Sequence, residues 1–301
     1  MPKTRAADAT AAHRTALDCL QQGLKAERSD DLQRALHHYA DAAIHAGDDA
    51  SIVAQALTRQ SAVYRRLSEW EFAVESARRA FEVADDADLG ELRAEALVSQ
   101  GNALICGGRL DEARGLFNRL MRIAIDDRQR GIAQQNLGNI HAQRREFAEA
   151  AKAIAQSRAL FVNAGYARGQ VIATNNLGRL AHDMGNMDEA ERLLSEALDG
   201  ARAVEDAELE ALAQLNLAQV NVVRRRFAEA EAMVMGAHGH FVASENRWRQ
   251  IECLTVLADI ADGEGGTEEA RTRLERGREI AQQIDARVEL ADIEARLQRH
   301  R

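Results

Sequence analysis

Hydrophobic and polar residues alternate along the chain with the period of an α-helix. Apolar side chains recur at intervals of three and four, as in the series Leu180, Met187, Ala190, Leu193, Leu194, Ala197 and Leu198. This spacing places them on one face of a helix, whereas a strand would alternate every second residue. The single proline, Pro2, leaves the interior of the chain without a helix breaker. The pattern therefore predicts an all-α protein built from long helices.

The helical pattern is repeated. An alanine recurs at spacings of 37 to 40 residues in seven similar segments, at Ala35, Ala73, Ala113, Ala150, Ala190, Ala230 and Ala270. Twelve residues before each alanine lies another small residue: Gly23, Ser61, Gly101, Gly138, Gly178, Ala218 and Ala258. A turn signal such as Gly107–Gly108 separates the two positions. The sequence predicts seven helix–turn–helix units, because a repeat of this length is one supersecondary unit.

The small residues have a packing reason. Where two helices cross closely, any side chain larger than a methyl group would force their axes apart. The expected first helices are 12–28, 50–67, 90–106, 129–144, 168–184, 207–224 and 247–263. The expected second helices are 31–46, 70–86, 110–125, 147–164, 187–204, 227–243 and 267–283, and 287–299 is expected to form a final capping helix through Val288, Ala291, Ile293, Ala295 and Leu297.

These units resemble the tetratricopeptide repeat, which has Leu-Gly or Leu-Ala near the middle of its first helix. The resemblance covers roughly residues 17–283, but each unit lacks the proline that usually ends the 34-residue form. The period near 40 resembles the longer-helix subclass of kinesin light chains, spindle adaptors and bacterial peptide sensors. The resemblance implies a right-handed superhelical solenoid whose concave wall is formed by the first helices. The expected organisation is a disordered arm at 1–11, seven repeats over 12–283 and a capping segment at 284–301.

Charge and composition narrow the function. The net charge of −9 and pI near 5.6 disfavour nucleic acid as a partner. The cysteines Cys19, Cys106 and Cys253 are far apart, which indicates reduced thiols and no metal site. There is no signal peptide and no run of 18 apolar residues, so the expected location is cytoplasmic without a membrane span. No cofactor is implied.

Three asparagines occupy one repeat position. Asn136, Asn176 and Asn216 each lie two residues before the small crossing residue. Asparagine forms helices poorly, so its recurrence there calls for another reason. A carboxamide both donates and accepts hydrogen bonds, and the resemblance implies that such a row binds the backbone of a peptide in the groove. The alternative is that these asparagines only bond neighbouring helices.

Further residues are expected to line the same groove. Around the asparagine row the expected lining residues are Gln135, Asn139, Gln143, Asn175, Arg179 and His182, and the second repeat adds Arg59, Arg65 and Arg66. The seventh repeat adds Glu252, Asp259 and Asp262, so the groove is expected to be basic toward the N-terminal end and acidic toward the other, which would orient a dipolar peptide. The alternative is that these side chains are solvated and have no partner.

These features favour a non-enzymatic adaptor or regulator that captures a protein or peptide segment. His182 beside Asp183 is the one acid–base pair near the groove, and no nucleophile or phosphate-binding loop accompanies it. An enzyme is therefore the least favoured class. The second candidate is a self-assembling scaffold, in which the N-terminal arm or convex face of one copy fills the groove of another.

Overall fold

The structure, a computed structural model, describes residues 2–29, 31–284 and 286–299, with side chains from residue 11 onward. The described residues form helices and turns and contain no strand. The chain divides into two compact units, Met1–Arg144 and Arg145–Arg301. The all-α class predicted from the hydrophobic period is confirmed.

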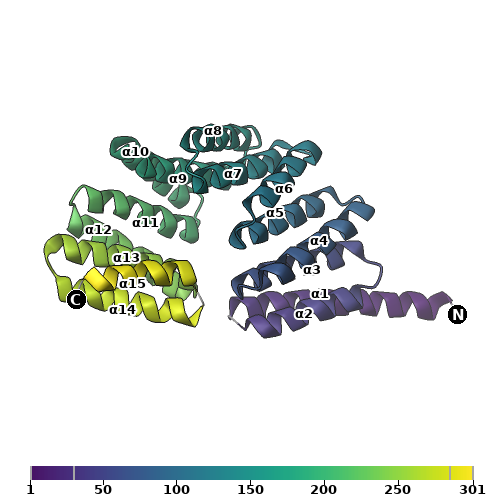
Figure 1. Ribbon diagram of the computed structural model, residues 1–301. Coiled ribbons are helices and arrows are strands. Elements are labelled where there is room, and N and C mark those ends of the chain that lie inside the picture. Colours follow the sequence, from purple (N-terminus) through teal and green to yellow (C-terminus); the bar gives the residue numbers. More distant parts are fainter. Residues whose placement is uncertain (1, 30, 285, 300–301) are drawn as a thin grey trace. The chain divides into compact units, whose positions relative to one another are not determined.

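The first unit contains the helices α1 (Pro2–Arg28), α2 (Leu32–Ala46), α3 (Ala50–Arg66), α4 (Trp70–Asp86), α5 (Gly90–Cys106), α6 (Leu110–Ile123) and α7 (Asp127–Gln143). Consecutive helices pack on each other throughout this unit, and α3 also packs directly on α5 (Figure 1). First helices of neighbouring repeats therefore lie side by side, with the second helices against one side of them.

The second unit contains the helices α8 (Phe147–Asn163), α9 (Ala167–Asp183), α10 (Met187–Ala203), α11 (Ala207–Val223), α12 (Phe227–Ala243), α13 (Arg247–Glu264), α14 (Thr267–Gln283) and α15 (Arg287–Arg299). Consecutive helices again pack together, and the first helices α9, α11 and α13 contact one another in order. Apart from the start of α1, the helix limits agree with the sequence prediction to within about two residues, which is the usual uncertainty of helix ends.

The crossing positions are confirmed by the packing. All seven recurring alanines are fully buried. A Cβ added to Gly101 would lie 2.4 Å from Phe117 Cζ, and one added to Gly178 would lie 2.6 Å from Leu194 Cγ. These distances leave no room for a methyl group, because non-bonded carbons normally approach no closer than about 3.5 Å. In both cases the small residue lets a large side chain of the second helix fit against the backbone of the first.

Irregular spacings of the repeat come from the second helices. Helix α6 has 14 residues and α2 has 15, whereas α4, α8, α10, α12 and α14 have 17. The missing residues account for the 37- and 38-residue spacings that involve these helices. The turn after α6 also differs, because its C-cap Ala124 is extended, with ψ of 130°. Every other connection whose residues are all described contains a residue with positive φ, such as Gly185 or Glu245.

The two ends of the chain differ from the expectation. Helix α1 begins at Pro2 and not near residue 12, so residues 2–11 are helical in the structure. Ala6, Ala7, Ala9, Ala11 and Ala12 favour this extension, since alanine is the best helix former. In α15, Ile293 is fully buried, whereas Val288 is 79% exposed. Residues 1, 285, 300 and 301, which were included in the predicted end segments, lie outside the described residues.

Candidate ligand-binding surface

Each first helix has one partly exposed stripe. The exposed and half-buried side chains along it are spaced by three or four residues, as expected for one face of a helix. We call this the open stripe. On α9 it consists of Arg168, Ile172, Asn176, Arg179 and Asp183, on α7 of Arg128, Ile132, Asn136, Asn139 and Gln143, and on α5 of Glu91, Glu95, Ser99 and Asn102.

Several residues predicted to bind a ligand lie on these stripes. Asn176 and Arg179 are half-buried on α9, and Asn136 and Asn139 are half-buried on α7. His182 is also half-buried, and its Nδ1 is 3.5 Å from Asp183 Oδ1. The helical register inferred from the sequence therefore places these polar side chains where a ligand can reach them.

Asn216 and Asn175 form a buried pair instead. The Asn216 amide nitrogen donates a hydrogen bond of 3.0 Å to Asn175 Oδ1, and the two residues are 2% and 3% exposed. The bond joins α11 to the preceding first helix α9 (Ala167–Asp183). For Asn216 the structure therefore shows the alternative, in which the asparagine bonds a neighbouring helix. The reason is that close packing of α11 on α9 encloses this position.

In the first unit, the predicted ligand-binding residues of α7 also differ in burial and in hydrogen bonding. The Asn136 amide nitrogen donates to the Ile132 carbonyl one turn earlier in α7, at 2.9 Å, so its donor is engaged by its own helix. Gln135 is 6% exposed and lies in the packed interior, not on the groove wall as expected. Gln143 is exposed at the end of the α7 stripe.

The three arginines of α3 that were predicted to line the groove differ in exposure and in their contacts. Arg59 and Arg66 are exposed, and Arg66 Nη1 donates to the Glu27 carbonyl oxygen at 3.2 Å, which ties α3 to the end of α1. Arg65 is half-buried and is the one member of this group that lines a cleft.

This cleft of about 280 Å³ lies in the first unit, on the open stripes of α5 and its neighbours. Its apolar lining includes Val98, Leu120 and Ile132, and its polar lining includes Thr58, Ser99 and Asn102. Four charged side chains complete it: Arg65 from α3, Glu91 and Glu95 from α5, and Arg128 from α7. An apolar floor with a few polar groups is the usual composition of a ligand site.

Most of these cleft residues were missed from the sequence. The asparagine row directed attention to α7, α9 and α11, whereas the cleft is centred on α5, where the equivalent residue is Ser99. The signal that was present is the spacing of Glu91 and Glu95. Residues four apart lie on one face of a helix. Glu95 precedes Ser99 by about one turn and Glu91 precedes it by about two.

Two polar features of the cleft stand out. The Thr58 hydroxyl oxygen is buried and has no hydrogen-bond partner among the described residues. Glu91 and Glu95 are both exposed and take part in no ion pair within the described chain. A buried polar atom without a partner costs free energy. A carboxylate without an ion pair is available to bind a cationic group of a ligand.

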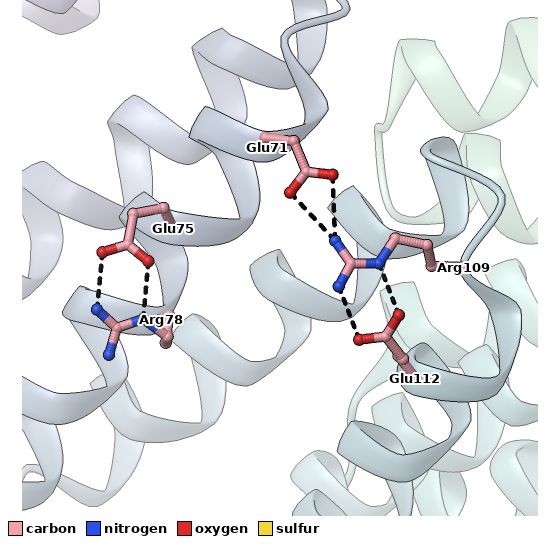
Figure 2. Close-up of polar contacts among 5 residues, drawn as sticks. All are labelled: Glu71, Glu75, Arg78, Arg109 and Glu112. Carbon is pink, nitrogen blue, oxygen red and sulfur yellow. Dashed lines mark hydrogen bonds and ion pairs between the residues drawn. The ribbon is translucent and has the colours of Figure 1, made fainter.

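The second helices behave differently. Figure 2 shows Arg109, which precedes α6, held between two carboxylates: its guanidinium donates at 2.6 and 2.7 Å to Glu112 and at 3.2 and 3.3 Å to Glu71 of α4. On α4, Arg78 makes a two-point contact with Glu75, at 2.7 and 2.8 Å. These contacts neutralise part of the charge on α4 and α6, whereas Glu91 and Glu95 of α5 have no ion pair of this kind within the described chain.

Within the described part of the chain, no group of three histidine, cysteine or carboxylate side chains is arranged to hold a metal ion. Cys19, Cys106 and Cys253 are free thiols. Burial raises the pKa of the Cys253 thiol to about 12. Among the described helices, none is both long and apolar enough to cross a membrane.

Comparison with known proteins gives a family match over part of the chain. Residues 170–235 match the model of the tetratricopeptide repeat family. No curated protein sequence is detectably similar to this chain.

Solved structures match over most of the chain. Aspartyl phosphate phosphatase F from Bacillus subtilis is 14% identical with a TM-score of 0.68, covering 93% of this chain and 73% of that one. The apo quorum sensor NprR from B. thuringiensis is 14% identical with a TM-score of 0.67, covering 89% and 77%. The Rap conjugation regulator of plasmid pLS20, in complex with the Phr* peptide, is 17% identical with a TM-score of 0.66, covering 89% and 74%. The TM-scores show a shared fold, and at these low identities they show no more than the fold.

Proposed function

The chain is a tetratricopeptide-repeat protein, and on that premise we propose that it is a non-enzymatic adaptor or regulator. It binds a segment of a partner protein or peptide on the open stripes of its first helices. The observation that supports this most directly is that polar side chains on these stripes, among them Asn176 and Arg179, are accessible and surround apolar positions such as Ile172. The polar groups of such a surface can hydrogen-bond the backbone of an extended segment, and its apolar positions can contact the side chains of that segment.

The comparisons support a binding role of this kind. The structure of the pLS20 regulator contains a peptide, and a Rap protein was solved with competence and sporulation factor; the latter is 16% identical with a TM-score of 0.58. A third similar protein is named as a phosphatase. We propose no such activity for this chain, because α9, which carries the His182–Asp183 pair at its end, contains no serine or cysteine that could act with the pair as a nucleophile.

The proposal also includes a cytoplasmic location. Its support is the set of three free thiols, since exported proteins usually pair their cysteines in disulfides. The high pKa of Cys253 keeps that thiol protonated and inert at neutral pH.

The test is capture of partners from native lysate by the tagged full-length chain, identified by mass spectrometry. A variant with Asn176→Ala and Arg179→Ala is expected to lose the captured partner while keeping its helicity. The matched control is Asn163→Ala with Arg79→Ala, because both of these residues are exposed and lie on second helices. Equal capture by the two variants would contradict binding on the open stripe of α9.

Self-assembly is the second candidate. Light scattering of the purified chain at increasing concentration distinguishes the two functions. An oligomer that dissociates on deletion of residues 2–11 supports the scaffold, and a monomer at all concentrations removes it.

A further inference from the structure

The α5 cleft is long and polarised. Its lining runs along α5 from Glu91 to Asn102, and at 1.5 Å per residue these eleven steps span about 16 Å. An extended chain advances about 3.3 Å per residue, so the cleft matches about five residues of an extended segment. A single small side chain would fill only part of it.

One end of the cleft is acidic. Glu91 and Glu95 project from adjacent turns at the beginning of α5, and neither is paired within the described chain. Arg128 of α7 also lines the cleft, but two carboxylates against one guanidinium leave a net negative charge there. A cationic group on a ligand is attracted to this end, and the low polarity of the adjacent lining strengthens the attraction.

The other end is basic. Arg65 lies in the last turn of α3 and lines the same cleft. Burial raises the pKa of the Cys106 thiol at the end of α5, and the Arg65 charge opposes that rise, which places Arg65 near the C-terminal end of α5. The cleft therefore has opposite charges toward its two ends.

The middle of the cleft suits an aliphatic stem. Val98 and Ile132 provide apolar surface between the charged ends. The polar groups here are Thr58, whose buried hydroxyl has no partner among the described residues, and Ser99, whose hydroxyl donates to Ser61 at 2.9 Å. Lysine and arginine side chains combine an apolar stem with a cationic head, which is the combination that this lining accommodates.

We infer that the α5 cleft binds an extended partner segment through a lysine or arginine side chain held by Glu91 and Glu95, with an acidic group of the same segment toward Arg65. This inference rests on the proposed function and names the chemistry of its ligand. It also assigns the selection of side chains to the cleft centred on α5, a helix that carries none of the three repeated asparagines.

The test uses positional-scanning hexapeptide libraries, acetylated and amidated so that the peptide ends carry no charge. In each library one position is fixed and the others are mixed, and binding to the full-length chain is measured by fluorescence anisotropy. Libraries with lysine or arginine at one fixed position are expected to bind about tenfold more tightly than those with norleucine or glutamate there, as expected for one charge-assisted contact. Glutamate is expected to be favoured three to five positions away from the lysine or arginine.

The variants assign this preference to the two carboxylates. Glu91→Gln with Glu95→Gln is expected to abolish the preference for lysine and arginine, and Glu91→Lys with Glu95→Lys is expected to reverse it toward glutamate. The control, Glu69→Gln with Asp86→Asn, removes two exposed charges of the first unit outside the cleft and is expected to keep the preference. Circular dichroism of each variant confirms that the helices are retained.

Two results would overturn the inference. One is library binding without a preference for a basic residue, and the other is a preference that survives both the glutamine and the lysine variants. In either case the lysate capture described above still reports on the proposed function through Asn176 and Arg179. The reverse result, a basic preference with no partner lost from the α9 variant, would move the binding role from α9 to the α5 cleft.

Discussion

At the scale of single residues, burial decides what a repeated asparagine does. Asn216 is enclosed and bonds Asn175 of another helix, whereas Asn136 is half-buried and bonds the carbonyl oxygen of Ile132 in its own helix. The two residues occupy the same position of the repeat, but only the first is part of the packing between helices. Their replacement is therefore expected to have different consequences.

Asn216→Ala is expected to lower the free energy of unfolding by about 1 to 3 kcal/mol, because it leaves the buried Asn175 oxygen without a donor. Asn136→Ala is expected to change it by less than about 0.5 kcal/mol. Urea denaturation followed by circular dichroism measures both. A double variant with Asn175→Ala should cost less than the sum of the single changes, and strict additivity would contradict the bond as the cause.

A second residue-scale prediction concerns the turns. Glu245 has φ of 54°, a left-handed conformation that costs an ordinary residue about 1 kcal/mol and glycine almost nothing. Glu245→Gly is expected to stabilise the protein by about 0.5 kcal/mol after the greater chain entropy of glycine is taken into account. Glu245→Ala removes the same carboxylate but keeps the strain. If both variants had the same unfolding midpoint, the backbone explanation would be wrong.

At the scale of helices, the fold depends on how closely each first helix approaches its second helix. Gly178 illustrates this, because an added Cβ would lie 2.8 Å from Leu194 Cδ2 and 3.2 Å from its backbone nitrogen. A side-chain rotation alone does not relieve the second contact, so α9 and α10 would have to move apart.

Gly178→Ala is consequently expected to destabilise the protein by about 1 to 3 kcal/mol, as overpacking does. Gly239, within α12, has no atom within 4 Å of its added Cβ. Gly239→Ala is expected to stabilise by about 0.5 to 1 kcal/mol, since alanine is the better helix former. Thermal melting of the two variants should therefore shift in opposite directions, and shifts of the same sign would argue against a close crossing.

The N-cap residue of α11, Asp206, makes a pH-dependent contact. Burial by itself raises the pKa of Asp206, but hydrogen bonds from the Leu209 amide at 3.0 Å and from Arg168 at 2.7 Å outweigh it and hold that pKa below its usual value. A lowered pKa in the folded state means that the charged form stabilises the fold at neutral pH. This contribution is lost as the pH falls through the folded-state pKa.

Asp206→Asn keeps a capping side chain but removes the charge that faces Arg168. At pH 7 the variant is expected to be less stable than the wild type by up to about 1 kcal/mol, because the pair is partly exposed. The difference should shrink on acidification, as the wild-type carboxylate becomes protonated. Urea midpoints measured from pH 7 to pH 3 test this, and a deficit independent of pH would contradict the assignment.

At the scale of the whole chain, contacts within each unit join only nearby repeats. Helix α15 packs on α14, and Ile293 is fully buried beside Gly277 in the same cluster as Leu274 and Ile280. In a linear array of this kind, stability comes from each repeat and its immediate neighbours. Loss of a terminal helix should therefore act locally.

Deletion of residues 286–301 is expected to expose this cluster and to speed amide hydrogen exchange in α13 and α14. Exchange in α1 to α5 is expected to stay unchanged, because these helices belong to the other unit. Hydrogen exchange followed by mass spectrometry provides both values in one experiment. A uniform increase along the chain would show that the array unfolds as one cooperative body.

The sequence by itself determined the helices and their pairing. Helix limits follow from the 3.6-residue period, and the crossings follow from Gly101, Gly178 and the buried alanines, because one methyl group too many at such a site is not tolerated. Both signals are local and recur seven times, so each repeat supports the reading of the others.

The tertiary structure alone decided which polar side chains are accessible. Asn176 and Asn216 have the same repeat position, yet one is half-buried on a stripe and the other is enclosed against Asn175. The cleft of Glu91 and Glu95 likewise depends on how α3, α5 and α7 lie beside one another. Repeat position fixes the side of the helix from which a residue projects, whereas burial depends on the neighbouring helices, whose side chains differ from one repeat to the next.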